Sequence, residues 1–294
     1  MSDYIHWSLA GTGLSLRGCN VDEILSERPD VRWFEALVDA HIVDGGERLH
    51  NLERIREHYP VTLHGLGLAL GSTSPLDTGY LVRIRALADR IDASWISDHI
   101  CFTSLGNCFS HEVLPLPYTE EALDHIASRI MQVQDFLGRR ILLENPARYL
   151  GYNHSTLSEG EFMAEMAERA DCYLLLDVNN SYVTQHNLGA DALDTIDCLP
   201  PQRVREIHLA GYDERDGCML GGHNNPVREP VWALYEAAQK RFTGTPTLIE
   251  WEHDIPDLKD ALRDVRRAKR VMHRAQNGLR KPAGVPAQGV RSPG

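Results

Sequence analysis

The chain has 294 residues, a formal net charge of -12 at pH 7, and a composition that is 43% hydrophobic and 24% charged. This charge argues against a nucleic-acid-binding protein, because such proteins neutralise phosphates with Lys and Arg. No apolar stretch approaches the roughly 20 residues that span a bilayer, and the start, "MSDYIHWSLAG", has no signal-peptide pattern. We therefore expect a cytoplasmic protein with no membrane and no nucleic-acid partner.

The six cysteines are scattered along the chain without a C-x-x-C pair. This spacing predicts neither a disulfide framework nor a thiolate zinc site. Any bound metal is therefore expected to have nitrogen and oxygen ligands.

Short apolar runs alternate with helical patterns from one end of the chain to the other. The runs that predict strands are 6–16, 31–37, 61–68, 94–100, 140–145, 172–179, 205–211 and 246–252. Between them, Thr119 is expected to cap a helix that ends before Gly138, and Ser158 and Glu161 have the spacing of a capping box. The segment 255–272 places apolar residues on one helical face and basic residues on the other.

Eight strand-then-helix units in a chain of this size predict a single α/β domain, a (β/α)8 barrel of the TIM type over residues 1–273. A doubly wound open sheet is the alternative. Residues 274–294 are rich in Gly, Pro and Arg and have no periodicity, which predicts a disordered C-terminal tail.

Polar residues stand where the predicted strands end. They are Glu35, His64, Asp98, His99, Glu144, Asn145, Asp177, Asn180, His208, Glu250 and Glu252. In a (β/α)8 barrel these ends meet at one rim, which is where active sites form. Buried imidazoles and carboxylates together suit iron, manganese, cobalt or zinc, so a metal centre is expected there. Glu144 is placed to bridge two ions.

Each of these residues also has a purely structural interpretation. A lone strand-end histidine is more often a hydrogen-bonded core residue, Asp177 could simply cap the following turn, and Glu250 could pair with arginines. The joint pattern favours the metal. Among the other histidines, His50, His58, His125 and His273 are expected to be solvated, His41 and His154 lie in predicted loops, and His111 is expected in a loop facing the substrate.

Several motifs together resemble a known family. They are "TLHGLGLALGS", "WISDHICF", "LPLPYTEEAL", "ILLENPARYL", "LLLDVNNSYV", "REIHLAGY", "HNNPV" followed by "VWALY", and "TLIEWEHDIP". Over residues 8–270 the chain is similar to the multinuclear non-heme iron-dependent oxidative enzymes, the family that includes the methanobactin-biosynthesis oxidase.

This resemblance implies a barrel with two or three iron ions, in mixed Fe(II) and Fe(III) states, and dioxygen as co-substrate. It also implies a ribosomal precursor peptide, with cysteine as the expected residue modified, and a separate peptide-recognition partner protein. By motif position the iron ligands are His64, His99, Glu144, Asp177, Asn180, His208, His223 and Glu250. No separate catalytic acid or base is indicated.

Two positions depart from the family pattern. Leu188 stands where a histidine is usual, with His186 as a substitute only if the loop shifts, and Gly221 stands where an aspartate is usual. Losing both predicts a dinuclear centre.

Two other functions fit the residues. A divalent-metal sugar isomerase or phosphate-ester hydrolase uses a similar rim for Lewis-acid chemistry and needs no oxygen. A non-catalytic scaffold that binds metal or peptide would consume no oxygen at all.

Overall fold

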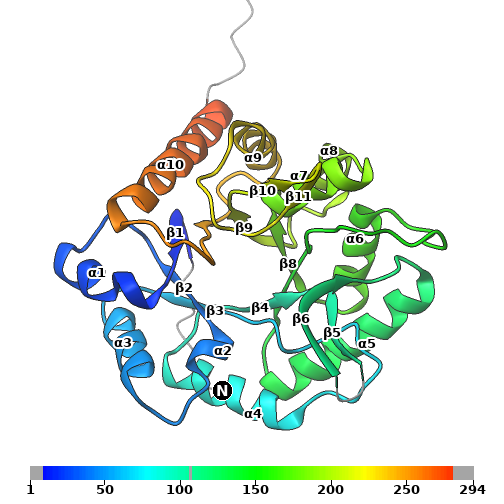
Figure 1. Ribbon diagram of the computed structural model, residues 1–294, viewed down its shortest axis with the longest axis horizontal. Helices are drawn as coiled ribbons and strands as arrows, with labels where there is room; N and C mark the ends of the chain where they lie inside the picture. Colours follow the sequence, from blue (N-terminus) through cyan, green and yellow to red (C-terminus); the bar gives the residue numbers. More distant parts are fainter. Residues whose placement is uncertain (1–8, 106–107, 281–294) are drawn as a thin grey trace, which may run out of the picture.

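The computed structural model describes residues 9–105 and 108–280. Eight parallel strands close into a barrel in the order β1-β12-β9-β8-β7-β4-β3-β2, with helices arranged around them (Figure 1). The barrel strands are β1 (Thr12–Ser15), β2 (Phe34–Leu37), β3 (Val61–His64), β4 (Ile96–His99), β7 (Leu142–Glu144), β8 (Tyr173–Asp177), β9 (Val204–Leu209) and β12 (Thr247–Ile249). The predicted (β/α)8 barrel is confirmed, and the open-sheet alternative is wrong.

The helices that follow the strands begin and end largely as local sequence dictates. They are α1 (Val21–Glu27), α2 (Val38–His41), α3 (Glu47–Arg56), α4 (Thr78–Arg90), α5 (Glu120–Leu137), α6 (Glu159–Arg169), α7 (Val178–Leu188), α8 (Ala192–Cys198), α9 (Glu229–Arg241) and α10 (Leu258–Arg280), with a 3-10 turn η1 (Gly18–Asn20). Thr119 caps α5, which ends at Gly138 with a φ of 68°, and the capping box of Ser158 and Glu161 begins α6.

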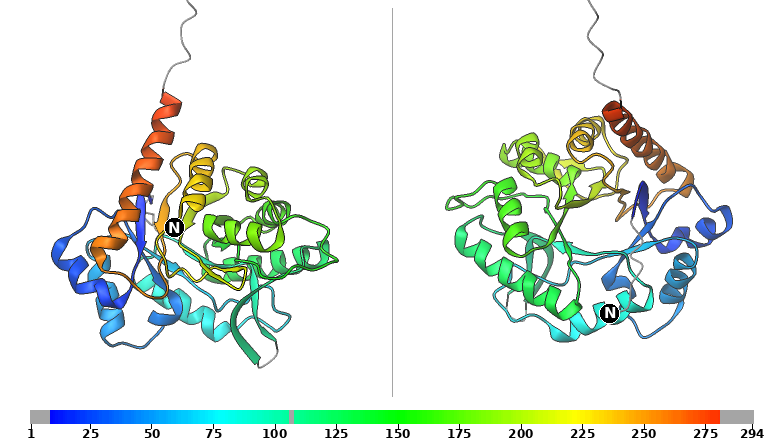
Figure 2. Two further views of the ribbon diagram at one scale, coloured as in Figure 1. Left: turned by 45° about the horizontal axis from the view of Figure 1, so that its top comes forward. Right: turned by 180° about the vertical axis from the view of Figure 1, so that it is seen from behind.

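Two antiparallel hairpins interrupt the regular alternation. One joins β5 (Cys101–Leu105) to β6 (Cys108–Pro115), and the other joins β10 (Asp213–Arg215) to β11 (Cys218–Leu220). Both follow the C-terminal ends of barrel strands, and Figure 2 shows the first projecting from the body of the molecule. The loop expected around His111 is therefore a strand, because its backbone pairs with the preceding strand. The side chain of His111 lies outside the described part of the chain.

The barrel interior changes from apolar to polar along its axis. Leu9 and Trp33, which precede β1 and β2, pack together with Leu248 of β12. Further along, side chains such as Glu35, Thr62 and His208 are buried inside. A larger apolar core lies between the strands and the helices. This apolar cluster fills one end of the barrel, and the polar groups lie towards the other end.

The predicted C-terminal tail begins too early. Helix α10 continues to Arg280, so residues 274–280 are helical and not disordered. Val271 and Met272 are buried, and Arg274 Nη2 pairs with Glu236 Oε1 of α9 at 2.8 Å. Residues 281–294 lie outside the described residues. Within the described ranges, no helix combines the length and apolarity needed to cross a membrane.

Candidate metal centre

The C-terminal ends of five neighbouring strands bring the predicted residues to one level of the barrel. His99 on β4 pairs in register with Glu144 on β7, and Asp177 on β8 pairs with His208 on β9. His64 ends β3 on the other side of His99. Because side chains alternate between the two faces of a strand, the register directs this set together into the mouth.

His64 and His99 form the first cluster with Glu144. The Nε2 atom of each ring lies 3.3 Å from Glu144 Oε2. The carbonyl of Gly65, 3.2 Å from His99 Nδ1, can only accept a hydrogen bond, so that ring presents an unprotonated Nε2 to the carboxylate. His64 Nδ1 lies 2.8 Å from Ser97 Oγ, whose own proton goes to a backbone carbonyl. Two nitrogen lone pairs therefore converge on one oxygen.

The second cluster joins the other side of Glu144. His208 Nδ1 lies 3.9 Å from Glu144 Oε1 and 3.1 Å from Glu250 Oε2. The ligand atoms of Glu144, Asp177, His208 and Glu250 all lie within 4.8 Å of one another, as do those of the first cluster. Glu144 thus belongs to both groups, which is the arrangement expected of a carboxylate that bridges two ions.

His223 and Asn180 complete this side of the site. His223 Nδ1 lies 3.0 Å from Glu250 Oε2, and its Nε2 lies 3.7 Å from Asp177 Oδ2. Asn180 Oδ1 is 3.3 Å from His223 Nε2, and Asn180 Nδ2 donates to Glu144 Oε1 at 3.4 Å. All eight ligand positions that the family resemblance implies are therefore brought to the mouth of the barrel.

The residues after β8 explain how a buried carboxylate is accommodated. Asp177 Oδ1 accepts from the backbone N–H of Asn180 at 2.7 Å and so caps α7. Its other oxygen, Oδ2, is buried without a hydrogen-bond partner, and so is Oε2 of Glu144. The capping interpretation is thus correct for one oxygen, and the second remains free for a cation. Two buried carboxylate oxygens that receive no hydrogen bond and lie beside imidazole nitrogens form a ligand set that fits a metal ion.

The electrostatics of the cluster show how protons balance the charge without metal. Burial raises the pKa of Glu144 well above its usual range, and burial also raises the pKa of Asp177 to about 6. Burial lowers the pKa of His64 well below normal and that of His99 to about 4. Burial opposes the charged form of His223 as well, but Glu250 outweighs it and raises this pKa to about 9.

A further pair of carboxylates lies below the centre. His208 Nε2 is 3.3 Å from Glu206 Oε1 and 3.6 Å from Glu35 Oε2, and Thr62 Oγ1 donates to Glu35 Oε2 at 3.2 Å. Glu35 was expected at the rim, whereas Glu206 was missed. The available signal was its position two residues before His208, which places both side chains on the same face of β9. Such a pair orients a ligating histidine.

The substitute ligand does not reach the centre. His186 is exposed on α7, with its Nε2 3.4 Å from the carbonyl of Gly217 in the β10–β11 hairpin. Leu188 is 36% exposed at the last residue of the same helix. Gly221 lies closer: a Cβ added there would be 3.1 Å from Asn180 Oδ1. An aspartate at 221 would therefore face the site, and here that carboxylate is missing.

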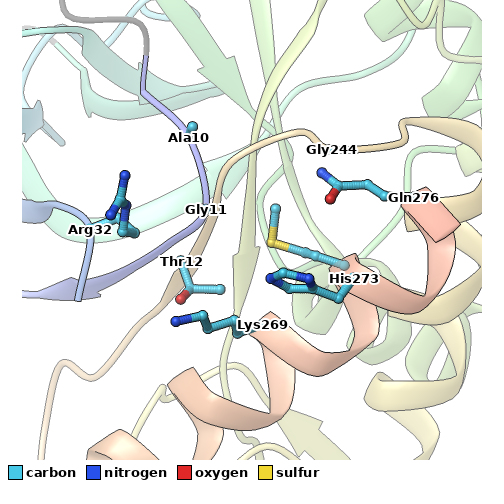
Figure 3. Close-up of a pocket in the computed structure, with 9 residues that line it drawn as sticks. Ala10, Gly11, Thr12, Arg32, Gly244, Lys269, His273 and Gln276 are labelled. Carbon is cyan, nitrogen blue, oxygen red and sulfur yellow. The ribbon is translucent and has the colours of Figure 1, made fainter. Parts of the chain in front are cut away.

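Within the described residues, His125 and His273 belong to none of the ligand clusters. His125 was expected to be solvated, but it is half-buried and its Nε2 donates to the carbonyl of Ser72 at 2.9 Å. His273 is exposed and lines a pocket of about 320 Å³ with Thr12 and Arg32 (Figure 3). This pocket lies between α10 and the N-terminal end of β1, at the opposite end of the barrel from the centre. That end of a (β/α)8 barrel ordinarily serves stability and not catalysis.

A closed barrel with buried histidines and carboxylates at its mouth defines the class of (β/α)8 enzymes with an active-site rim. The chain belongs to the family of MbnB/TglH/ChrH, the RiPP precursor modification enzymes, whose model matches residues 11–273. RiPPs are ribosomally synthesised and post-translationally modified peptides. Family membership thus makes the chain an enzyme that acts on a precursor peptide.

Curated relatives match nearly the whole chain, and solved structures of low sequence identity share its fold. A UPF0276 protein from Acaryochloris marina is 46% identical over 92% of this chain and 98% of its own. A UPF0276 protein from Caulobacter vibrioides is 44% identical over 88% of this chain and 94% of its own. Two solved structures share the fold. A D-tagatose 3-epimerase-like protein is 13% identical, with a TM-score of 0.59 over 92% of this chain and 99% of its own. Endonuclease IV from Thermus thermophilus is 15% identical, with a TM-score of 0.58 over 90% of this chain and 99% of its own.

Proposed function

We propose that this enzyme is an iron- and dioxygen-dependent oxidase that modifies a residue, with cysteine expected, of a ribosomally synthesised precursor peptide. The observation that carries the proposal is Glu144, whose two oxygens face two separate clusters of buried ligand atoms. Two adjacent metal positions suit a reaction in which dioxygen and a thiol are activated together. Family membership supports the peptide substrate.

The proposed ligands are His64, His99, Glu144, Asp177, Asn180, His208, His223 and Glu250. Iron held there would supply redox chemistry with dioxygen and a Lewis-acid position that lowers the pKa of a cysteine thiol. A separate recognition protein for the precursor peptide is part of the same proposal.

The chain's own contribution is orientation and control of protons. Ser97 and the carbonyl of Gly65 turn the two Nε2 atoms of the first cluster towards Glu144. Asn180 Nδ2 fixes one Glu144 oxygen. Because the centre is buried, water is largely excluded, and the protons that the carboxyl groups hold must leave before cations enter.

The direct test is the iron content and optical spectrum of protein purified without oxygen, followed by exposure to air with a cysteine-containing peptide. We expect about two irons per chain and oxygen consumption that depends on the peptide. The matched control is the same peptide with serine in place of cysteine, which should consume no oxygen. Iron-free protein that works anaerobically with manganese would instead establish the isomerase or hydrolase alternative. Peptide binding without turnover would establish the scaffold.

A further inference from the structure

Arg17 is a cation at the mouth of the barrel, and one edge of its guanidinium has no partner. It lies two residues after β1 (Thr12–Ser15), at the same end of the barrel as the metal centre. Its Nη1 donates to the neighbouring carbonyl of Leu16 at 3.1 Å. Its Nε and Nη2 are buried and have no hydrogen-bond partner within the described ranges of the chain. A buried guanidinium edge of this kind is costly unless a ligand satisfies it.

The surroundings of Arg17 connect it to the centre. Ser15 Oγ accepts from the backbone N–H of Trp251 at 2.9 Å, which ties the end of β1 to the loop that carries Glu252. Arg17 therefore follows a strand end that is hydrogen-bonded to the residue directly after Glu250, one of the proposed ligands.

The two free nitrogen atoms have a specific geometry. Nε and Nη2 form one edge of the planar guanidinium, with their N–H bonds parallel. This is the edge with which arginine binds both oxygens of a carboxylate at once. The remaining nitrogen of Arg17 is already engaged by Leu16, so the side chain is anchored with its bidentate edge left free. Metal ions in the centre would add positive charge and make an anion still more favourable here.

We propose that Arg17 is a substrate-recognition residue that binds a carboxylate of the peptide beside the metal centre. This inference rests on the proposed peptide substrate. The carboxylate is either the C-terminus of the peptide or the side chain of an acidic residue next to the modified one, and both offer the same two oxygens. Arg17 then fixes the distance between that carboxylate and the reacting side chain.

Four small probes test the inference. N-acetylcysteine is compared with its amide, and N-acetyl-Cys-Asp-amide with N-acetyl-Cys-Asn-amide, by calorimetric titration of the purified protein under argon, with its metal content measured. We expect at least one acid to bind about tenfold more tightly than its neutral partner, because charge-assisted bidentate bonds are the strong ones. The pair that shows the difference identifies the source of the carboxylate.

Variants separate direct recognition from general charge. Arg17→Met should bind the acid and its neutral partner equally, whereas Arg17→Lys should keep a smaller preference, because lysine offers a point charge without the two-donor edge. Arg48→Met is the matched control, because Arg48 is exposed and its charge, like that of Arg17, acts to lower the pKa of His41, which burial lowers most. Charges exposed to water interact weakly. Loss of Arg48 should therefore leave the preference for the acid within about twofold of wild type.

Two results would overturn the inference. One is equal binding of acid and neutral partner to the wild-type protein in both pairs, which needs no variant. The other is a preference that persists in Arg17→Met, since the carboxylate would then be binding the metal. If Arg17→Met does not fold, an undiminished preference in Arg17→Lys has the same meaning. Because these titrations need neither iron nor turnover, they succeed or fail separately from the oxidase test.

Discussion

Replacing Glu144 with glutamine separates the fold of the barrel from its metal centre. Glu144 is fully buried, and burial raises its pKa well above the usual range, so burial favours the neutral form of this carboxyl in the metal-free protein. Glutamine is a neutral side chain of nearly the same shape. We therefore expect the free energy of unfolding of the metal-free Glu144→Gln variant to lie within about 0.5 kcal/mol of that of the metal-free wild type. Substitutions that leave a fold unperturbed have effects of this size.

The metal-loaded proteins should differ strongly. A carboxylate and a divalent cation about 4 Å apart attract each other by about 8 kcal/mol at an effective dielectric constant of about 20. Removing the proton from a carboxyl with a raised pKa offsets part of this attraction. If only a quarter remains, the variant loses about 2 kcal/mol of binding free energy, or roughly thirtyfold in affinity, per ion. Because Glu144 faces both clusters, both sites should weaken.

Thermal unfolding with and without metal is the assay. Metal at about one hundred times its dissociation constant stabilises a protein by about 2.7 kcal/mol, which raises Tm by about 5 °C in a domain of this size. The wild type should show this rise, and Glu144→Gln should show little of it. Wild-type metal content and an unchanged rise in the variant would refute the bridging role.

The matched control is another buried glutamate. Glu159 Oε1 accepts from Tyr118 at 2.9 Å and lies 3.2 Å from Arg148 Nε, and Glu159 belongs to neither cluster. Glu159→Gln leaves a buried arginine without its counter-charge. This variant should therefore lower the Tm of the metal-free protein and leave the metal content unchanged, which is the opposite pattern.

Three further predictions concern the same centre. Glu206→Gln replaces the carboxyl group beside His208 Nε2 and should lower metal affinity about 10–100-fold. An unchanged metal affinity, measured by calorimetric titration, would show that Glu206 does not position the ring. At pH 7 the metal-free protein holds a proton on His223, whose pKa is raised to about 9, so metal must displace it and affinity should rise with pH up to about 9. Calorimetry in two buffers of different ionisation enthalpy would contradict this if it detected no proton release. With Leu188 and Gly221 at usual ligand positions, elemental analysis should find two metal ions per chain, and three would show that a histidine and an aspartate there are dispensable.

Local pattern was enough to predict the barrel and the gathering of strand-end histidines and carboxylates at its mouth. Strands of alternating or continuous apolar residues, each ending in a histidine or carboxylate, specify both the repeating unit and the position of the polar rim, because all parallel strands present their C-terminal ends to the same side. Asp177 shows the limit of this reasoning. The sequence allowed either a helix cap or a metal ligand, and the structure shows that one oxygen caps α7 while the other faces the cluster.

Where the prediction went wrong, the deciding contacts came from distant segments. Residues 274–280 have a disorder-like composition, yet they continue helix α10, whose Arg274 pairs with Glu236 of α9. His186 lies near the expected ligand position in the chain, but α7 turns it outward to the β10–β11 hairpin. Composition and spacing do not contain these contacts.

The amino-acid sequence by itself determined which side chains line the mouth of the barrel, since one strand end per unit supplies them in a fixed periodic order. Only the tertiary structure decided how they divide into two clusters around Glu144, that Glu206 stands behind His208, and that the bidentate edge of Arg17 is buried without a partner. The physical reason is that burial, ring orientation and hydrogen-bond satisfaction are properties of packed neighbours, and those neighbours come from opposite ends of the chain.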